Sequence, residues 1–446
     1  MLNFFKYLKG VIAITGFMWF ANAYAVLPIQ EISLTNGSKA YLIQTSSIPM
    51  IDIEVSIDAG SRYDPKDKSG LAALTAALLT RGIEWRGGIL NEALQADAIA
   101  ELGASITASS SGERTIVRAR TLSKPEILEP LLDLMVATLA KPVFDSHVID
   151  REKQRIIAAV REGDTKPEVV LQKTFRNKVF ANYPLSQSPT VESVTLISQV
   201  DIKSFHHDFY RQDRVIVNIV GDVSQTKAHE IAQKLVTSLP STGPQITPLP
   251  PLARSPIAPE SERVVRVPFQ VQQTHIAMGM TAITRDNPDY FHLLVGNYVL
   301  GGGGFVSRLV GEVRDKRGFA YSVFSYFQPG RDTGTFEAGL QTRNDQANQA
   351  LEVLQATISR FIEEGPTDSE LAAAKSNLIN GFPLRLDSNR KLLDNLSSIT
   401  WNKLPLDTLD VWTQQVAAVR KEGIRNAFKR HLDMRRMISV LVGGTQ

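Results

Sequence analysis

The sequence contains no cysteine in its 446 residues. This absence excludes disulfide staples, thiolate metal ligands and a cysteine nucleophile, and a chain of this length has enough core to fold without disulfides. An excess of either charge is also missing, since 49 Lys and Arg balance 46 Asp and Glu to a net charge of +3. There is no basic stripe or acidic tail, so nucleic acid is not an expected partner.

Recognisable catalytic motifs are missing as well. None of the seven histidines belongs to an H-x-x-E-H zinc motif, and the nearest stretch, HEIAQ at 229–233, ends in glutamine. The glycine run at 301–304 lacks the Lys-Ser/Thr of a phosphate-binding loop and has no parallel β-α-β pattern around it. No spacing of Asp, Glu or Ser indicates another hydrolytic centre, which leaves a cryptic hydrolase as a minor alternative.

Long apolar runs are confined to the N-terminus. Residues 1–25 combine Lys6 and Lys9, an apolar run of 10 residues at 11–20, and small residues at Ala23 and Ala25. This pattern predicts a signal peptide cleaved near Ala25–Val26, and a run of that length is too short to span a bilayer. We therefore expect a periplasmic or secreted protein with no membrane span after cleavage; an uncleaved membrane anchor is the alternative.

The remaining chain is organised as two copies of one unit. Residues 239–262 hold seven prolines and little periodicity, which is typical of an extended linker. On either side, residues 201–223 align without gaps on 423–445 at a constant offset of 222. Patterns of strands and amphipathic helices predict an α+β fold with domains at 26–238 and 263–446. Each is expected to be an antiparallel-rich sheet with helices on one face, and together they would form a clamshell.

The stretch GGGGFVSRLVGEVRDKRGFAYSVFSY at 301–326 is the most specific sequence in the chain. Together with the two related halves and the proline-rich linker, it resembles the pitrilysin/insulinase zinc-peptidase family, in its processing-peptidase-like subgroup with two domains per chain. The resemblance covers essentially the whole chain after the predicted signal peptide.

The zinc motif of that family is degenerate in this chain. Where the family's helix resembles G-L-A-H-F-L-E-H, this chain has GLAALTAA at 70–77, so that Ala73 and Ala77 replace the histidine ligands and Ala76 replaces the glutamate base. On a later helix, Ala159 stands at the position of the third ligand. Alanine has no lone pair for zinc and no proton to exchange, so we expect no metal or other cofactor in this chain.

Two substrate-binding features of the family are retained in part. LGASITASSSGERT at 102–115 resembles its substrate-edge strand, although Thr107 replaces the usual asparagine and Ser110 a threonine. The resemblance implies that this strand binds peptide by β-augmentation. The glycines would let the substrate backbone approach closely. The implied substrate-binding residues are Ala104, Ser105, Ile106 and Thr107 in the strand, and Gly301, Gly302, Gly303 and Gly304 in the glycine run.

A helix is predicted to follow the glycines and to end at Gly318, a natural residue for a helix C-terminus. Its apolar face would comprise Val306, Leu309, Val310 and Val313, and FAYSVFSYF at 319–327 predicts a strand. Arg314 and Tyr321 would then lie on either side of one tight corner. From spacing alone they could form a surface ion pair and a core contact. The resemblance implies instead an arginine–tyrosine pair that faces the zinc of a composite active site.

These expectations lead to one hypothesis and one main alternative. The chain would be the non-zinc subunit of a periplasmic heterodimeric metallopeptidase, inactive alone. It would supply Arg314 and Tyr321 in trans to a homologous subunit that carries the zinc, and the two chains would enclose extended peptides. The alternative is a catalytically inactive scaffold or peptide-binding protein, as a homodimer or as a subunit of a larger complex.

Overall fold

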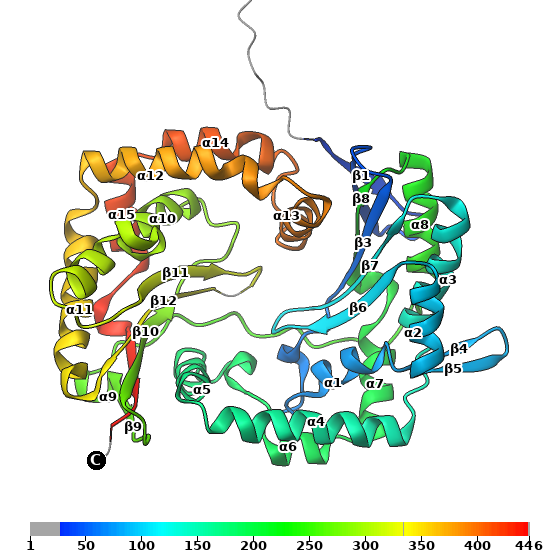
Figure 1. The fold of residues 1–446 in the computed structure, drawn as a ribbon, viewed down its shortest axis with the longest axis horizontal. Helices are drawn as coiled ribbons and strands as arrows, with labels where there is room; N and C mark the ends of the chain where they lie inside the picture. Colours follow the sequence, from blue (N-terminus) through cyan, green and yellow to red (C-terminus); the bar gives the residue numbers. More distant parts are fainter. Residues whose placement is uncertain (1–26, 333, 445–446) are drawn as a thin grey trace, which may run out of the picture.

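The computed structural model describes residues 27–332 and 334–444, so the predicted signal peptide lies outside the described range. The α+β fold class is confirmed: two sheets with their helices lie side by side, one in each half of the chain (Figure 1). We call residues 27–238 the first half and 263–444 the second half. Over the described residues, no helix is long and apolar enough to cross a membrane.

The first half is built around a six-stranded sheet in the order β1-β2-β8-β3-β7-β6. A separate two-stranded sheet is formed by β4 and β5. Its elements are β1 (Ile29–Ser33), β2 (Lys39–Gln44), β3 (Met50–Ile57), α1 (Leu71–Leu78), β4 (Gly82–Trp85), β5 (Gly88–Asn91), α2 (Glu92–Glu101), β6 (Ser105–Ser110), β7 (Thr115–Leu122), α3 (Pro125–Ala140), α4 (Ser146–Asp164), α5 (Pro167–Val179), α6 (Val191–Leu196), α7 (Gln199–Phe209), β8 (Val215–Gly221) and α8 (Gln225–Thr237).

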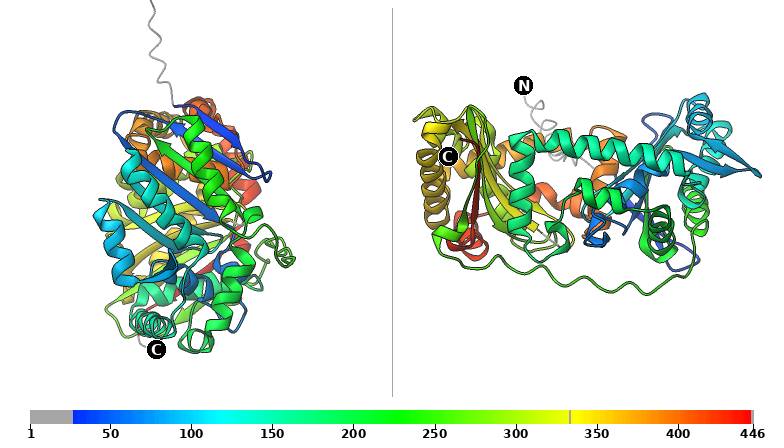
Figure 2. Two further views of the ribbon diagram at one scale, coloured as in Figure 1. Left: turned by 90° about the vertical axis from the view of Figure 1, so that its right-hand side faces the viewer. Right: turned by 90° about the horizontal axis from the view of Figure 1, so that it is seen from below.

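The second half contains a five-stranded sheet in the order β11-β12-β10-β13-β9. Residues 242–259 form no helix or strand and run as an extended segment from one half to the other (Figure 2). The elements that follow are α9 (Glu260–Arg263), β9 (Val264–Val267), β10 (Gln273–Thr281), α10 (Tyr290–Asn297), β11 (Val323–Pro329), β12 (Gly334–Arg343), α11 (Ala347–Glu364), α12 (Asp368–Gly381), α13 (Asn389–Trp401), α14 (Thr408–Ala418), α15 (Lys421–His431) and β13 (Ile438–Val442).

The internal repeat seen in the sequence is also a structural repeat. The strand order β8-β3-β7-β6 in the first sheet corresponds to β13-β10-β12-β11 in the second. Helices α7 and α15 begin and end 222 residues apart, and so do the 3₁₀ turns at Gln212–Arg214 and Met434–Arg436. In this numbering β6 and β11 are equivalent strands, and each lies at the edge of its sheet.

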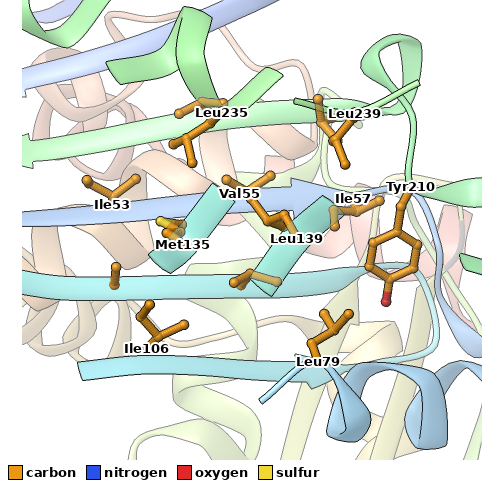
Figure 3. Close-up of a cluster of buried hydrophobic side chains, with 14 of the residues drawn as sticks. Ile53, Val55, Ile57, Leu79, Ile106, Met135, Leu139, Tyr210, Leu235 and Leu239 are labelled. Carbon is orange, nitrogen blue, oxygen red and sulfur yellow. The ribbon is translucent and has the colours of Figure 1, made fainter. Parts of the chain in front are cut away.

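Each sheet packs its own half's helices against one face, as the alternating pattern predicted. In β3 the side chains of Ile53, Val55 and Ile57 point to one side and are almost fully buried. They meet Met135 and Leu139 of α3 in the core of the first half (Figure 3). The apolar side chains recur every second residue on β3 and about every 3.6 residues on α3. Each element therefore has one apolar face, and the two faces pack together in the core of the first half.

The opposite face of each sheet is covered by a helix from the other half. Helix α13 of the second half packs on β2, β3 and β8, where its buried leucines contact Ile43 of β2 and Val220 of β8. In exchange, α5 of the first half packs on β10 and β13, and Phe175 contacts Ala277 there. Because each half completes the packing of the other, the two sheets are held in a fixed arrangement.

Candidate functional site

The four positions that the resemblance assigns to the zinc site lie on two neighbouring helices of the first half. Helix α1 carries Ala73, Ala76 and Ala77, and α4, which packs against α1, carries Ala159. Ala76 is fully buried, Ala77 is half-buried, and Ala73 and Ala159 are exposed. Methyl groups at all four positions do not fit a zinc ion or a general base. Elsewhere in the described chain, no group of three or more His, Cys, Asp or Glu could hold a metal.

The helix that would carry the zinc motif is nevertheless held firmly at its N-terminus. The carboxylate of Asp64 accepts hydrogen bonds of 2.8 Å from the backbone N–H groups of Gly70 and Ala72. Burial raises the pKa of Asp64 to about 7, against the opposing effect of these hydrogen bonds. Helix α1 is thus fixed at its start, although Ala73, Ala76 and Ala77 on it offer no metal ligand.

The strand predicted to bind substrate lies at a sheet edge. Strand β6 pairs only with β7 in the sheet, antiparallel, with Ile106 opposite Ala119. Ile106 points into the core, whereas Ser105 and Thr107 are exposed; Ala104 lies just before the strand. An edge strand presents main-chain donors and acceptors on its outer side, which is the geometry that β-augmentation requires.

Packing within the chain accounts for most of the glycine run. A Cβ on Gly301 would lie 2.4 Å from the hydroxyl oxygen of Ser325 in β11, and one on Gly303 would lie 2.6 Å from the carbonyl oxygen of Tyr298. Gly302 is similarly close to Asn297. Only Gly304 faces open space, with a φ of +61°. Gly301 therefore lets the turn pack on β11, and Gly302 and Gly303 let it pack back on Asn297 and Tyr298.

The helix after the glycines is shorter than predicted. It starts at Arg308 and continues as a π-helical turn at Val310–Asp315, after a 3₁₀ turn that includes Val306. Leu309, Val310 and Val313 are buried as predicted. The assignment of Val306 to the same apolar face was wrong, because this side chain is 71% exposed.

Arg314 and Tyr321 meet at the corner that ends this helix. Gly318 has a φ of +64°, and its N–H donates to the carbonyl of Arg314, so the predicted helix end is confirmed. The guanidinium of Arg314 lies 5.1 Å from the centre of the Tyr321 ring. The strand predicted to contain Tyr321 begins only at Val323. Tyr321 therefore sits in the turn before β11 and is 81% exposed.

A third residue, Phe305, completes this group and was missed from the sequence. Its ring centre lies 4.8 Å from the guanidinium of Arg314, on which Tyr321 also packs. Phe305 is 75% exposed. We call Phe305, Arg314 and Tyr321 the aromatic–arginine cluster. The available signal was its place in the sequence, since Phe305 is a large aromatic residue directly after four glycines.

Arg308 anchors the cluster to the body of the second half. Its guanidinium donates two hydrogen bonds of 2.7 Å to the carboxylate of Glu370 and one of 3.0 Å to the carbonyl of Gly365. Burial of Glu370 opposes its ionisation, but hydrogen bonds from Arg308 and Thr367 outweigh this and lower the pKa of Glu370 to about 2. The start of the short helix is thereby fixed to the connection between α11 and α12.

Comparison with known families agrees with this geometry. The family described as Insulinase (Peptidase family M16) matches residues 40–190, and the one described as Peptidase M16 inactive domain matches residues 197–378. The chain belongs to peptidase family M16. The suspected resemblance is thus confirmed, and with it the M16-like, two-domain architecture.

Individual relatives fall into the same family. The chain is 24% identical to the uncharacterized zinc protease YmxG of Bacillus subtilis, over 91% of this chain and 95% of that protein. It is also 24% identical to the non-peptidase homolog YmxG of Helicobacter pylori, over 94% of each chain. A crystal structure of a peptidase M16 inactive domain from Pseudomonas fluorescens is 29% identical. It superposes with a TM-score of 0.87, over 94% of this chain and 98% of that one. These likenesses and the four alanines identify an M16-like protein of the inactive kind.

Proposed function

We propose that this chain is the non-zinc subunit of a heterodimeric M16 metallopeptidase, with domains at 26–238 and 263–446 and a periplasmic location. The observation that carries the proposal is that two opposite features occur together. The positions assigned to zinc are alanine, whereas a half-buried Arg314 and an exposed Tyr321 lie together on an anchored corner. An arginine 31% exposed and a tyrosine 81% exposed add little to the core of this chain.

The chemistry available to this pair is the binding of a peptide carbonyl. A guanidinium and a phenol O–H both donate hydrogen bonds, and neither needs to lose a proton to do so. When water attacks the carbonyl, negative charge develops on its oxygen, and donors fixed in advance stabilise this charge. Zinc and the general base would come from the partner subunit, and this chain would bind and orient the peptide.

The experiment uses a partner chosen by its intact H-x-x-E-H motif. The two purified chains are mixed, and cleavage of a peptide library is measured with Arg314→Ala and Tyr321→Phe variants of this chain. We expect each variant to lower kcat by about 10²–10³, the usual effect of removing one oxyanion donor.

Arg317→Ala is the matched control. Arg317 lies three residues along the chain from Arg314 and is bound to Glu312 at 2.8 Å. Its loss should leave cleavage within a factor of two of wild type. Unchanged cleavage in all three variants would refute the role in trans.

The second candidate is a scaffold or peptide-binding protein without proteolysis. The exposed outer side of β6 favours it, because an edge strand can bind an extended peptide without a catalytic group nearby. The two functions differ in one readout: a scaffold binds peptide alone and gains no cleavage from any zinc-bearing homologue.

A further inference from the structure

A cavity of about 500 Å³ lies directly behind the aromatic–arginine cluster. Gly304 and Ser322 line it, and they are the chain neighbours of Phe305 and Tyr321. Its volume is in the range of ligand-binding pockets. The other walls come from α10 and β11, and include Tyr290, Leu293, Leu294, Val323, Phe324 and Phe327.

Two polar side chains of the lining are bonded to each other. Asn297 donates from its amide to the carbonyl of Ser325 at 2.9 Å, and the hydroxyl of Ser325 donates to the side-chain oxygen of Asn297 at 2.7 Å. Both residues are buried, at 8% and 1% exposure. These two side chains therefore do not need a ligand as a hydrogen-bond partner, and most of the other lining residues are apolar or aromatic.

The lining also carries no side chain that is charged at neutral pH. No Asp, Glu, Lys, Arg or His is among the residues that surround the cavity. Arg285 stacks on the ring of Tyr290, 3.5 Å from its centre, but does not belong to the lining. A charged side chain in the cavity would lose its hydration without gaining a partner, and this desolvation strongly disfavours its entry.

We propose that this cavity is a specificity pocket for one large apolar side chain of an extended peptide, whose neighbouring carbonyl lies on Arg314. The inference deepens the proposed function and rests on it for the role of Arg314. Phe305 and Tyr321 form the rim, and they hold the guanidinium of Arg314 between their rings. The apolar walls select the side chain, and the cation at the rim selects the main-chain carbonyl beside it.

The test measures binding by the single chain, without a partner and without cleavage. Five fluorescent peptides share one small-residue host sequence and differ at one position: Trp, Phe, Leu, Ser or Asp. Fluorescence anisotropy gives Kd for each. We expect the Phe and Leu peptides to bind at least about tenfold more tightly than the Ser peptide, and the Asp peptide to bind most weakly.

Variants that change the size of the pocket distinguish a change in side-chain preference from a general loss of structure. Leu294→Ala enlarges the cavity, so the preference should move from Leu towards Trp, and Leu294→Phe should weaken binding of the Phe peptide by about tenfold. Leu371→Ala is the matched control, since Leu371 is also partly buried against the core of the second half but does not line the cavity. It should leave the order of the five peptides unchanged.

The outcomes distinguish this inference from the proposed function. Three results would refute the assignment of the cavity as a specificity pocket. They are equal affinities for the five peptides, no binding of any of them, and the same order of preference in the Leu294→Ala and Leu371→Ala chains. The loss of cleavage in the Arg314→Ala pair would then still support the trans role. If the single chain clearly prefers apolar peptides, but the Arg314→Ala variant mixed with its partner cleaves as well as wild type, the specificity pocket is supported and the role of Arg314 in trans is refuted.

Discussion

Replacing Arg118 by methionine should destabilise the whole chain, because Arg118 compensates a carboxylate buried between the two halves. Glu54 of β3 is fully buried, Arg118 donates to its carboxylate from Nε at 2.8 Å, and Nη2 of Arg118 lies 2.7 Å from the same oxygen. Ser397 of α13 also donates to Glu54. The pair therefore lies where α13 of the second half covers the sheet of the first.

The expected cost follows from this burial. Removing one partner of a buried ion pair typically costs about 3–5 kcal/mol, because the other charge is left uncompensated. Against a total stability of about 5–15 kcal/mol, this is a large fraction. Adding Glu54→Gln to Arg118→Met should recover part of the loss, since the double variant no longer buries an unpaired charge.

Chemical denaturation followed by tryptophan fluorescence measures the effect. Trp401 ends α13, is 3% exposed and donates to Glu113 at 3.0 Å, so it reports on the contact between the halves. Arg390→Met is the control, because Arg390 is 54% exposed and lies 3.6 Å from Asp394, and should cost less than about 1 kcal/mol. An Arg118→Met chain as stable as this control would refute the reasoning.

Two further predictions concern pH. Because the pKa of Asp64 is raised to about 7, the folded chain binds a proton that the unfolded chain does not. Its contribution to stability therefore grows by about 2.6 kcal/mol as pH falls from 8 to 5. Asp64→Asn should flatten that slope in denaturation curves, and an unchanged slope would contradict the prediction. The pKa of Glu370 is lowered to about 2, so its pairing with Arg308 stabilises the fold above pH 4.5 and is lost towards pH 2. Glu370→Gln should cost about 1–2 kcal/mol at pH 7 and almost nothing near pH 2, whereas an equal cost at both pH values would show that Glu370 acts through packing alone.

The sequence could predict the parts of this molecule that local patterns determine. The equivalent helices α7 and α15, the helix end at Gly318 and the alternation in β3 all follow from periodicity and turn chemistry within about twenty residues. The exchange of α5 and α13 between the halves could not be predicted in this way. It depends on contacts between segments far apart in the chain, and an amphipathic helix does not indicate which sheet it will cover.

The candidate site was predictable to a similar degree. The degenerate positions on α1 and α4 and the corner with Arg314 could be located by motif, position by position. Val306 was wrongly assigned to the apolar face, and Phe305 was not recognised as part of the site. The reason is that the glycine run continues as irregular turns, whose side-chain directions do not follow helical periodicity.

The most direct test of the account is the activity of this chain mixed with a homologue that carries an intact zinc motif. The account predicts no zinc and no cleavage for the chain alone, and cleavage by the mixed pair that falls about 10²–10³ in the Arg314→Ala variant. If the zinc-bearing homologue cleaves peptides equally well with and without this chain, or if the single chain binds stoichiometric zinc, the account is wrong.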